Sequence, residues 1–163
     1  VRALAAAVSA PLPTAAGDGP RPPLESLVRK EYRRLAKAVS AAGAEPPDAV
    51  LHELRILGKR LRYTAELVEP ALADAGRRKE VRRLLKATTA MQDVLGDHQD
   101  ACVAQQRVRE LLAGLGDAAG LDVAFAAGRI VEREEVRRLV TRAAWPPAWQ
   151  AVVAAADDAL PAA

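Results

Sequence analysis

Four residues in one short stretch have the types and spacing needed to bind an anion: His52, Arg55, Lys59 and Arg62. On an α-helix with about 3.6 residues per turn, steps of three, four and three residues place them along one stripe, which we call the cationic ladder. An apolar seam with the same period is formed by Leu54, Leu57, Leu61, Ala65 and Val68. We expect this seam on the opposite side of the helix. A ladder of cations predicts a polyanionic partner.

Two neighbouring segments carry basic residues at helical spacing, with apolar residues on the other side. The basic residues are Lys30, Arg33, Arg34 and Lys37 in the first segment, and Lys79, Arg82, Arg83 and Lys86 in the second. If the apolar stripes meet in one core, the basic stripes converge on a shared groove. Neighbouring like charges cost roughly 0.2–0.5 kcal/mol per pair, so such a groove favours a bound anion. The alternative is that each stripe is a solvated face, neutralised by Glu31, Glu53 and Glu80.

The charge distribution supports an anionic partner. The 163-residue chain has a net charge of only +3, but residues 29–86 hold fifteen basic and eight acidic side chains. Residues 87–163 hold seven basic and eleven acidic side chains. Nineteen of the 24 basic residues are arginine, which suits bidentate phosphate contacts, although GC-rich coding also raises arginine and alanine. Binding of a polyanion is therefore expected in the middle of the chain.

The composition predicts an all-α protein, because alanine, leucine, arginine and glutamate favour helix and no segment alternates β-branched residues. We expect an antiparallel helical bundle of about four long helices plus short terminal helices. The expected helices are residues 2–9, 24–42, 48–68 with Asp48 as N-cap, about 74–112 with Gly96 in the interior, 123–143, and a short one after Pro146 and Pro147. Residues 1–23 read as the tail of a preceding region and a Pro/Gly-rich linker, and residues 24–163 as the bundle.

No constellation in the sequence indicates catalysis. No serine has a histidine and an aspartate near it in the sequence that would activate it as a nucleophile. The glycine-rich phosphate loop GxxxxGK[ST] is also absent. Asp93, Asp97 and Asp100 could hold Mg²⁺ or Ca²⁺, but pairing with basic residues is the favoured interpretation. His52 could contact phosphate, bind metal or be a surface residue, and it has no second histidine one turn away. We therefore expect no enzyme activity, no cofactor and no bound metal.

The remaining composition restricts the location. Cys102 is the only cysteine, which excludes an internal disulfide and fits a reducing compartment. No run of about 18 apolar residues is present, so no membrane partner is expected. Aromatic residues are too few to predict platforms for stacking nucleobases. We expect a cytoplasmic protein.

Two strings, LHELRILGKRLRYTAELVEP from Leu51 and MQDVLGDHQDACVA from Met91, resemble the two landmarks of the CHAD family, the conserved histidine α-helical domain. The resemblance implies two four-helix halves related by a pseudo-twofold axis, and binding of inorganic polyphosphate in a basic channel. It also implies association with CYTH triphosphate-tunnel domains, although no ExExK segment is present. Matched residue by residue, it nominates His52, Arg55, Lys59, Arg60 and Arg62. To these the face argument adds Lys30, Arg33, Arg34, Lys37, Arg83 and Lys86.

The resemblance covers about residues 24–160, which corresponds to one half, the C-terminal one, of such a domain. A second copy or a preceding half would then complete the pseudo-twofold arrangement. The function predicted is non-enzymatic polyphosphate binding, with non-specific binding of nucleic acid and association with polyphosphate granules as further expectations. One alternative is a helical scaffold that docks an acidic protein through its basic face. Another is a metal-assisted phosphohydrolase using Asp93, Asp97 and Asp100.

Overall fold

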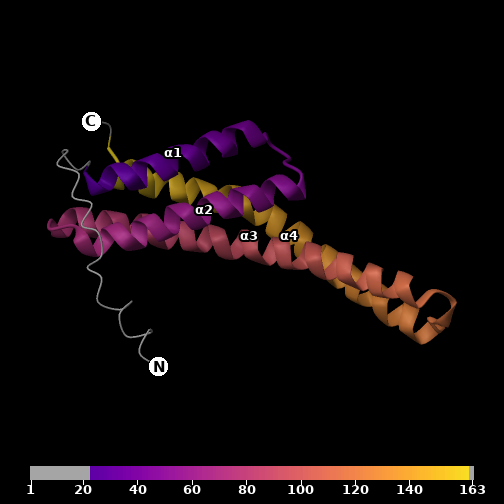
Figure 1. Cartoon of the computed structure of the whole chain (residues 1–163). Helices are drawn as coiled ribbons and strands as arrows, with labels where there is room; N and C mark the ends of the chain where they lie inside the picture. Colours follow the sequence, from indigo (N-terminus) through magenta and orange to yellow (C-terminus); the bar gives the residue numbers. More distant parts are fainter. Residues whose placement is uncertain (1–22, 162–163) are drawn as a thin grey trace, which may run out of the picture.

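The computed structural model describes residues 23–161, and this part of the chain contains helices and no strand. Successive α-helices run in opposite directions along the length of the molecule, as Figure 1 shows. They are α1 (Leu24–Ala42), α2 (Asp48–Val68), α3 (Ala75–Leu115) and α4 (Leu121–Ala159), with short 3₁₀ turns η1 (Glu69–Ala71) and η2 (Gly116–Ala118). The predicted all-α class is confirmed. The predicted helix at residues 2–9 lies outside the described residues.

The short helices α1 and α2 form because their apolar residues recur every three or four positions and meet in one core. Val28 and Leu35 of α1, and Leu51, Leu54 and Leu61 of α2, are almost fully buried. The predicted bounds of both helices are confirmed, but Asp48 is not the N-cap. Pro47 occupies that position without a side-chain cap, and Asp48 is the first helical residue. Its carboxylate is therefore free to bind side chains of other helices.

The long helices α3 and α4 contain 41 and 39 residues, so each extends for about 60 Å. At the start of α3, the Asp74 carboxylate accepts a hydrogen bond of 2.7 Å from the backbone N–H of Arg77, as an N-cap should. Gly96 lies inside α3, as predicted. Helix α3 runs to Leu115 rather than ending near Leu112, and α4 begins at Leu121 rather than at residue 123, so only a short connection around η2 joins them.

The predicted helix break at Pro146 and Pro147 is wrong, because α4 continues through both prolines to Ala159. Each proline lacks the N–H that would bond to the preceding turn, at a cost of about 3 kcal/mol in a helix interior. Trp145 and Trp149 flank the prolines and are buried, and Trp149 stacks on Tyr32 of α1 with ring centroids 6.0 Å apart. Burial of two large aromatic side chains offsets the lost hydrogen bonds.

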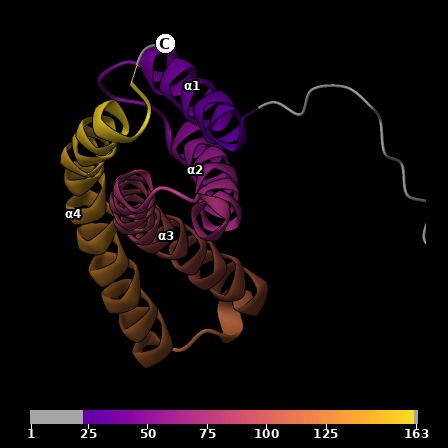
Figure 2. The same ribbon diagram turned by 90° about the vertical axis from the view of Figure 1, so that its left-hand side faces the viewer.

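Helices α1 and α2 cover only one end of the longer pair, as Figures 1 and 2 show. Beyond them, α3 and α4 continue as a two-helix projection, which we call the hairpin arm (residues 103–140). Many large apolar side chains of the arm face solvent, including Leu121 (90% exposed) and Phe125 (70% exposed). The core thus lies at the four-helix end. None of the described helices combines the length and the apolarity needed to cross a lipid bilayer.

Candidate functional site

The cationic ladder lies on the flank of α2 rather than on the side opposite the core. All four of its side chains are half-buried, whereas residues that point directly away from the core, such as Ile56 and Tyr63, are exposed. The expected opposition of ladder and apolar seam is therefore wrong. The reason is that Gly58 and Leu51 extend the buried face of α2 toward the ladder. Half-buried side chains have fewer accessible conformations than fully exposed ones, so the positions of these cations are better defined.

Gly96 of α3 makes room for one rung of the ladder. A Cβ added at Gly96 would lie 3.6 Å from Nε and 3.8 Å from Nη2 of Arg55. The guanidinium of Arg55 therefore rests against the backbone of α3, where most side chains would displace it. Two helices that are distant in sequence thus position this cation.

The ladder contains buried nitrogen atoms that have no hydrogen-bond partner among the described residues. They are Nδ1 of His52, Nε of Arg55 and Nε of Arg62, and Nε2 of Gln92 on α3 is in the same state. Gln92 is only 8% exposed, and its Nε2 lies 3.3 Å from where a Cβ of Gly58 would be. A buried polar group without a partner costs about 1–3 kcal/mol. The arginine and glutamine nitrogen atoms of this set are donors, and donors without a partner favour a ligand that is rich in acceptor oxygens.

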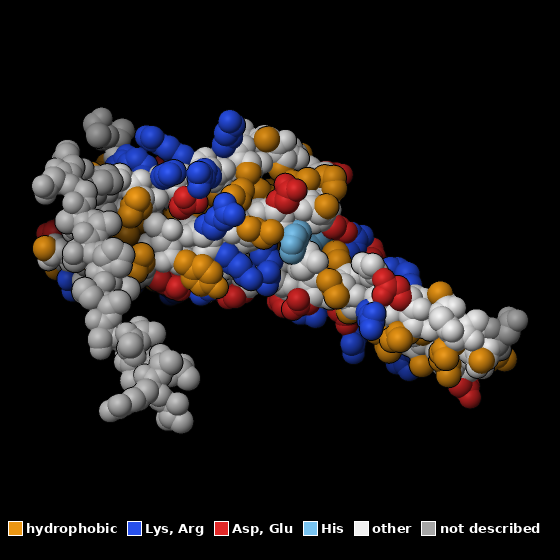
Figure 3. Space-filling view, in the orientation of Figure 1, with side chains coloured by type: hydrophobic (Ala, Val, Ile, Leu, Met, Phe, Trp, Pro, Cys, Tyr) orange, Lys and Arg blue, Asp and Glu red, His pale blue; other side chains and the backbone are white. Residues whose placement is uncertain are grey.

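The other nominated cations are exposed: Arg60 on α2, Lys30, Arg33, Arg34 and Lys37 on α1, and Arg83 and Lys86 on α3. Lys and Arg side chains spread over α1 and α2 on the face drawn in Figure 3. Convergence of the three basic stripes on one groove stays a prediction.

Few cations of the predicted site are neutralised by ion pairs. Arg34 pairs with Glu31 at 2.9 Å and Arg62 with Glu66 at 3.1 Å. Within residues 23–161, the other nominated cations have no carboxylate within 4.0 Å, so the proposed neutralising role of Glu53 is not seen there. Arg62 also stacks on the exposed ring of Tyr63, with its guanidinium carbon 4.6 Å from the ring centroid. The spacing of the charged residues gave no indication of this aromatic side chain beside the ladder.

The ladder gives a first prediction at Gly96. Gly96→Ala should raise the free energy of unfolding by up to about 1 kcal/mol, because alanine favours helix and its methyl group would make only ordinary contacts. Gly96→Leu should instead push the Arg55 guanidinium away from α3 and weaken anion binding. Thermal unfolding and binding titrations of the two variants measure this difference. Equal anion affinity in both variants would contradict the positioning role of Gly96.

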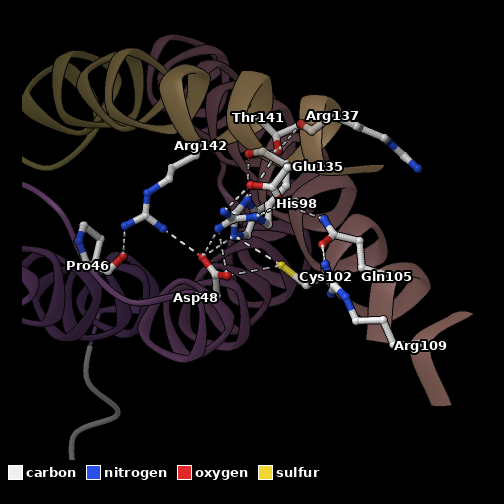
Figure 4. A network of polar contacts seen from close by, with 11 residues as sticks. Pro46, Asp48, His98, Cys102, Gln105, Arg109, Glu135, Arg137, Thr141 and Arg142 are labelled. Carbon is white, nitrogen blue, oxygen red and sulfur yellow. Dashed lines mark hydrogen bonds and ion pairs between the residues drawn. The ribbon is translucent and has the colours of Figure 1, made fainter. Parts of the chain in front are cut away.

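A second constellation, shown in Figure 4, surrounds His98 of α3. Nε2 of His98 lies 3.1 Å from Oδ1 of Asp48, and Nδ1 lies 3.3 Å from the carbonyl oxygen of Arg138. Arg138 and Arg142 of α4 donate to the Asp48 carboxylate at 3.0 and 2.8 Å. Arg142 also donates to the carbonyl of Pro46. The network joins the start of α2 to the middles of α3 and α4.

The network changes the proton affinities of its members. Burial alone would raise the pKa of Asp48, but the charges of Arg138 and His98 and the His98 hydrogen bond hold it below its ordinary value of 3.8. Burial and the adjacent Asp48 raise the pKa of Cys102 to about 11. Hydrogen bonds from Arg138 and Gln105 lower the pKa of Glu135 to about 2. At neutral pH, Asp48 and Glu135 are therefore anionic and Cys102 is a thiol.

The acidic stripe does not form a metal site in the described part of the chain. Asp93, Asp97 and Asp100 are all exposed, and Asp97 pairs with Arg137 at 2.6 Å. The group of metal-ligating side chains found among residues 23–161 is instead Asp48, His98 and Cys102. Asp93, Asp97 and Asp100 are not among the side chains that the described structure groups as possible metal ligands, and pairing with a basic residue is confirmed for Asp97.

Comparison with known proteins identifies the family. A model of the CHAD domain matches residues 1–109, which include the cationic ladder, Gln92 and Gly96 and end before α4. No curated protein and no solved structure matches the chain. Since the family model covers more than half of the sequence, the chain belongs to the CHAD domain family.

Proposed function

We propose that this protein binds inorganic polyphosphate without hydrolysing it, through the cationic ladder on α2 and its neighbours on α3. The observation that carries the proposal is the set of buried, unpartnered nitrogen atoms on His52, Arg55, Arg62 and Gln92. Phosphate oxygens are strong acceptors, and charge-assisted hydrogen bonds from arginine to phosphate are about twice as strong as neutral ones. The CHAD resemblance and the excess of basic residues in this part of the chain support the same ligand.

The length of the ladder favours a polymer over a single phosphate. His52 and Arg62 are ten residues apart, so the ladder extends for about 15 Å along α2. One phosphate can reach a single rung, whereas a chain of phosphates can contact all four. Affinity should therefore grow with chain length and fall steeply with salt, because each contact displaces counterions.

Titration with three ligands tests the proposal: long-chain polyphosphate, orthophosphate and single-stranded DNA, each in one series of salt concentrations. A separate assay measures phosphate release in the presence of Mg²⁺. Binding that grows with polymer length, without phosphate release, supports the proposal. Release of phosphate would favour the phosphohydrolase, and the absence of any polyanion preference would favour a scaffold for an acidic protein. Single-stranded DNA is included because Tyr63 lies beside Arg62, and aromatic rings stack on nucleobases.

A second candidate role is pairing with another copy of this chain through the hairpin arm. Ten large apolar side chains are exposed there: Val103, Leu111, Leu115, Leu121, Val123, Phe125, Ile130, Val136, Leu139 and Val140. Together they present on the order of 1,000 Å² of apolar surface. Each partner in an interface of standard size buries about 800 Å². The arm carries six basic and six acidic residues, so two copies can approach along it without net repulsion.

The pairing predicts a dimer whose formation depends on the outer stripe of α4. Phe125→Ser combined with Leu139→Ser should yield monomers, because both side chains are exposed on one stripe of that helix. Light scattering after size-exclusion chromatography over a range of concentrations measures this. Leu67→Ser is the matched control, since Leu67 is 75% exposed on α2 and should leave the dimer intact. A wild-type chain that remains monomeric at high micromolar concentration overturns the pairing.

A further inference from the structure

The cationic ladder lies between two carboxylates on the same stripe of α2. Asp48 comes four residues before His52, and Glu66 comes four residues after Arg62, so each lies about one helical turn beyond an end of the ladder. We propose that the ladder binds a run of about six phosphates and that Glu66 determines where this run ends. This role of Glu66 rests on the proposed binding of polyphosphate at the ladder.

The length of the run follows from the rise of the helix. The ten positions from His52 to Arg62 extend for about 15 Å along α2. Successive phosphorus atoms of a polyphosphate chain are roughly 3 Å apart, so a segment of about six phosphates spans the four rungs over about 15 Å. A longer chain meets a carboxylate rather than a cation at the next position of the stripe. Affinity should therefore rise steeply up to this length and slowly beyond it.

At the start of α2 the carboxylate is fixed in place by α4. The oxygens of Asp48 accept hydrogen bonds from Arg138 at 3.0 Å and from Arg142 at 2.8 Å. Arg138 also donates to Glu135 at 2.7 Å, and Figure 4 shows Arg142 reaching both Asp48 and the carbonyl of Pro46. The cations next to Asp48 are therefore engaged with other groups, and they do not extend the ladder at this end.

At the other end the carboxylate can move. Oε1 of Glu66 lies 3.1 Å from Nη1 of Arg62, and the Glu66 side chain is 43% exposed. An exposed ion pair between residues four apart on a helix is weak. A polymer held by the other three rungs presents its next phosphate to Arg62 at a high effective concentration, so it can displace Glu66. The ring of Tyr63, 4.6 Å from the guanidinium carbon, keeps Arg62 at the end of the ladder during this exchange.

Glu53 offers a matched control on the same helix. Its side chain is exposed on the other flank of α2, where it lines a small pocket together with Ala38 and Ala42 of α1. The ladder instead contacts α3, since Arg55 rests against Gly96. A change of charge at Glu53 therefore alters the net charge of α2 by the same amount without altering the stripe of the ladder.

The experiment titrates the full chain with orthophosphate, tripolyphosphate and polyphosphate fractions of defined length at one salt concentration. Glu66→Gln should raise the affinity for chains of about six phosphates or more by roughly twofold to fivefold, the equivalent of one exposed ion pair. The gain should be smaller for tripolyphosphate, which can bind the other rungs, and smaller in Glu53→Gln. Thermal unfolding of each variant shows that the fold is intact.

Glu66→Lys provides the sharper measurement because it lengthens the ladder. A cation at position 66 would extend the stripe from about 15 to about 21 Å, so the length at which affinity levels off should increase by about two phosphates. Glu53→Lys adds the same charge and should leave that length unchanged. Equal shifts in both variants, no shift in Glu66→Lys, or equal affinities of Glu66→Gln and Glu53→Gln would overturn the role of Glu66.

Failure of this role is distinguishable from failure of polyphosphate binding. A wild-type chain that binds polyphosphate more tightly than orthophosphate, but whose length dependence does not respond to Glu66→Lys, retains the proposed function and loses the role of Glu66. A wild-type chain that shows no preference for polyphosphate overturns both.

Discussion

Replacement of both Arg55 and Lys59 by alanine should weaken polyphosphate binding by at least 1.5–3 kcal/mol, the range of about one lost hydrogen bond to a charged group. This corresponds to roughly tenfold to more than a hundredfold in affinity. Both side chains are half-buried on the ladder, and neither has a carboxylate partner within residues 23–161, so their donors are available to phosphate. Titration of long-chain polyphosphate at fixed salt measures the loss, and the salt dependence should become shallower because fewer counterions are released.

The fold should tolerate this double substitution, because neither side chain belongs to the buried core. Thermal unfolding should change little. Arg107→Ala combined with Arg129→Ala is the matched control, since it removes the same charge from exposed positions of the hairpin arm. Equal loss of affinity in the control would indicate attraction by net charge alone. Unchanged affinity in Arg55→Ala with Lys59→Ala would place the site elsewhere, and a collapsed fold would contradict the placement of the ladder on the flank of α2.

Asp48→Ala should produce the largest loss of stability, about 2–3 kcal/mol, because it leaves the buried His98 and two arginines without their common acceptor. The expected loss of stability is smaller than for a fully buried ion pair because the Asp48 side chain is partly exposed. For a chain of this size, such a loss lowers the melting temperature by roughly 4–12 °C. Asp48→Asn keeps one carbonyl oxygen as acceptor and should lose less. A melting temperature of Asp48→Ala equal to that of the wild type would show that the network does not hold the helices together.

The contribution of Asp48 to the free energy of unfolding should decrease at low pH. The pKa of Asp48 is lowered in the folded protein, so its stabilising charge is present above about pH 4 and is lost as the pH falls below its ordinary value of 3.8. The difference in unfolding free energy between the wild type and Asp48→Asn should therefore be constant near neutral pH and shrink under acid conditions. Denaturant titrations at several pH values measure it. A difference that grows on acidification would contradict a stabilising role of the ionised Asp48 carboxylate.

The bounds of α1 and α2 and the spacing of the ladder residues could be predicted from the sequence, because helical spacing depends only on residues close together in the chain. The position of the ladder relative to the core could not be predicted from the charged residues alone. Gly58 has no side chain and reads as neutral in the sequence, yet it belongs to the buried face of α2. The helix break at Pro146 was predicted because the intrinsic cost of proline was counted without the burial of Trp145 and Trp149.

The Asp48 network escaped prediction because its members are far apart in the chain. Asp48 and His98 are 50 positions apart, and Asp48 and Arg142 are 94 positions apart. The sequence predicted Asp48 as a helix cap and assigned no role to His98. One signal could have indicated Gln92, namely a polar residue at a position where the apolar period of α3 requires a buried one. A polar residue at such a position indicates a buried hydrogen-bonding group, which the stripes of charged residues do not reveal.

The length of α3 links the ladder to the hairpin arm. One uninterrupted rod carries Gln92 and Gly96 next to the ladder and, farther along, half of the hairpin arm. The backbone hydrogen bonds of α3 continue without a break from the residues beneath Arg55 into the arm. A partner bound at the hairpin arm would therefore contact the same helix that supports Arg55.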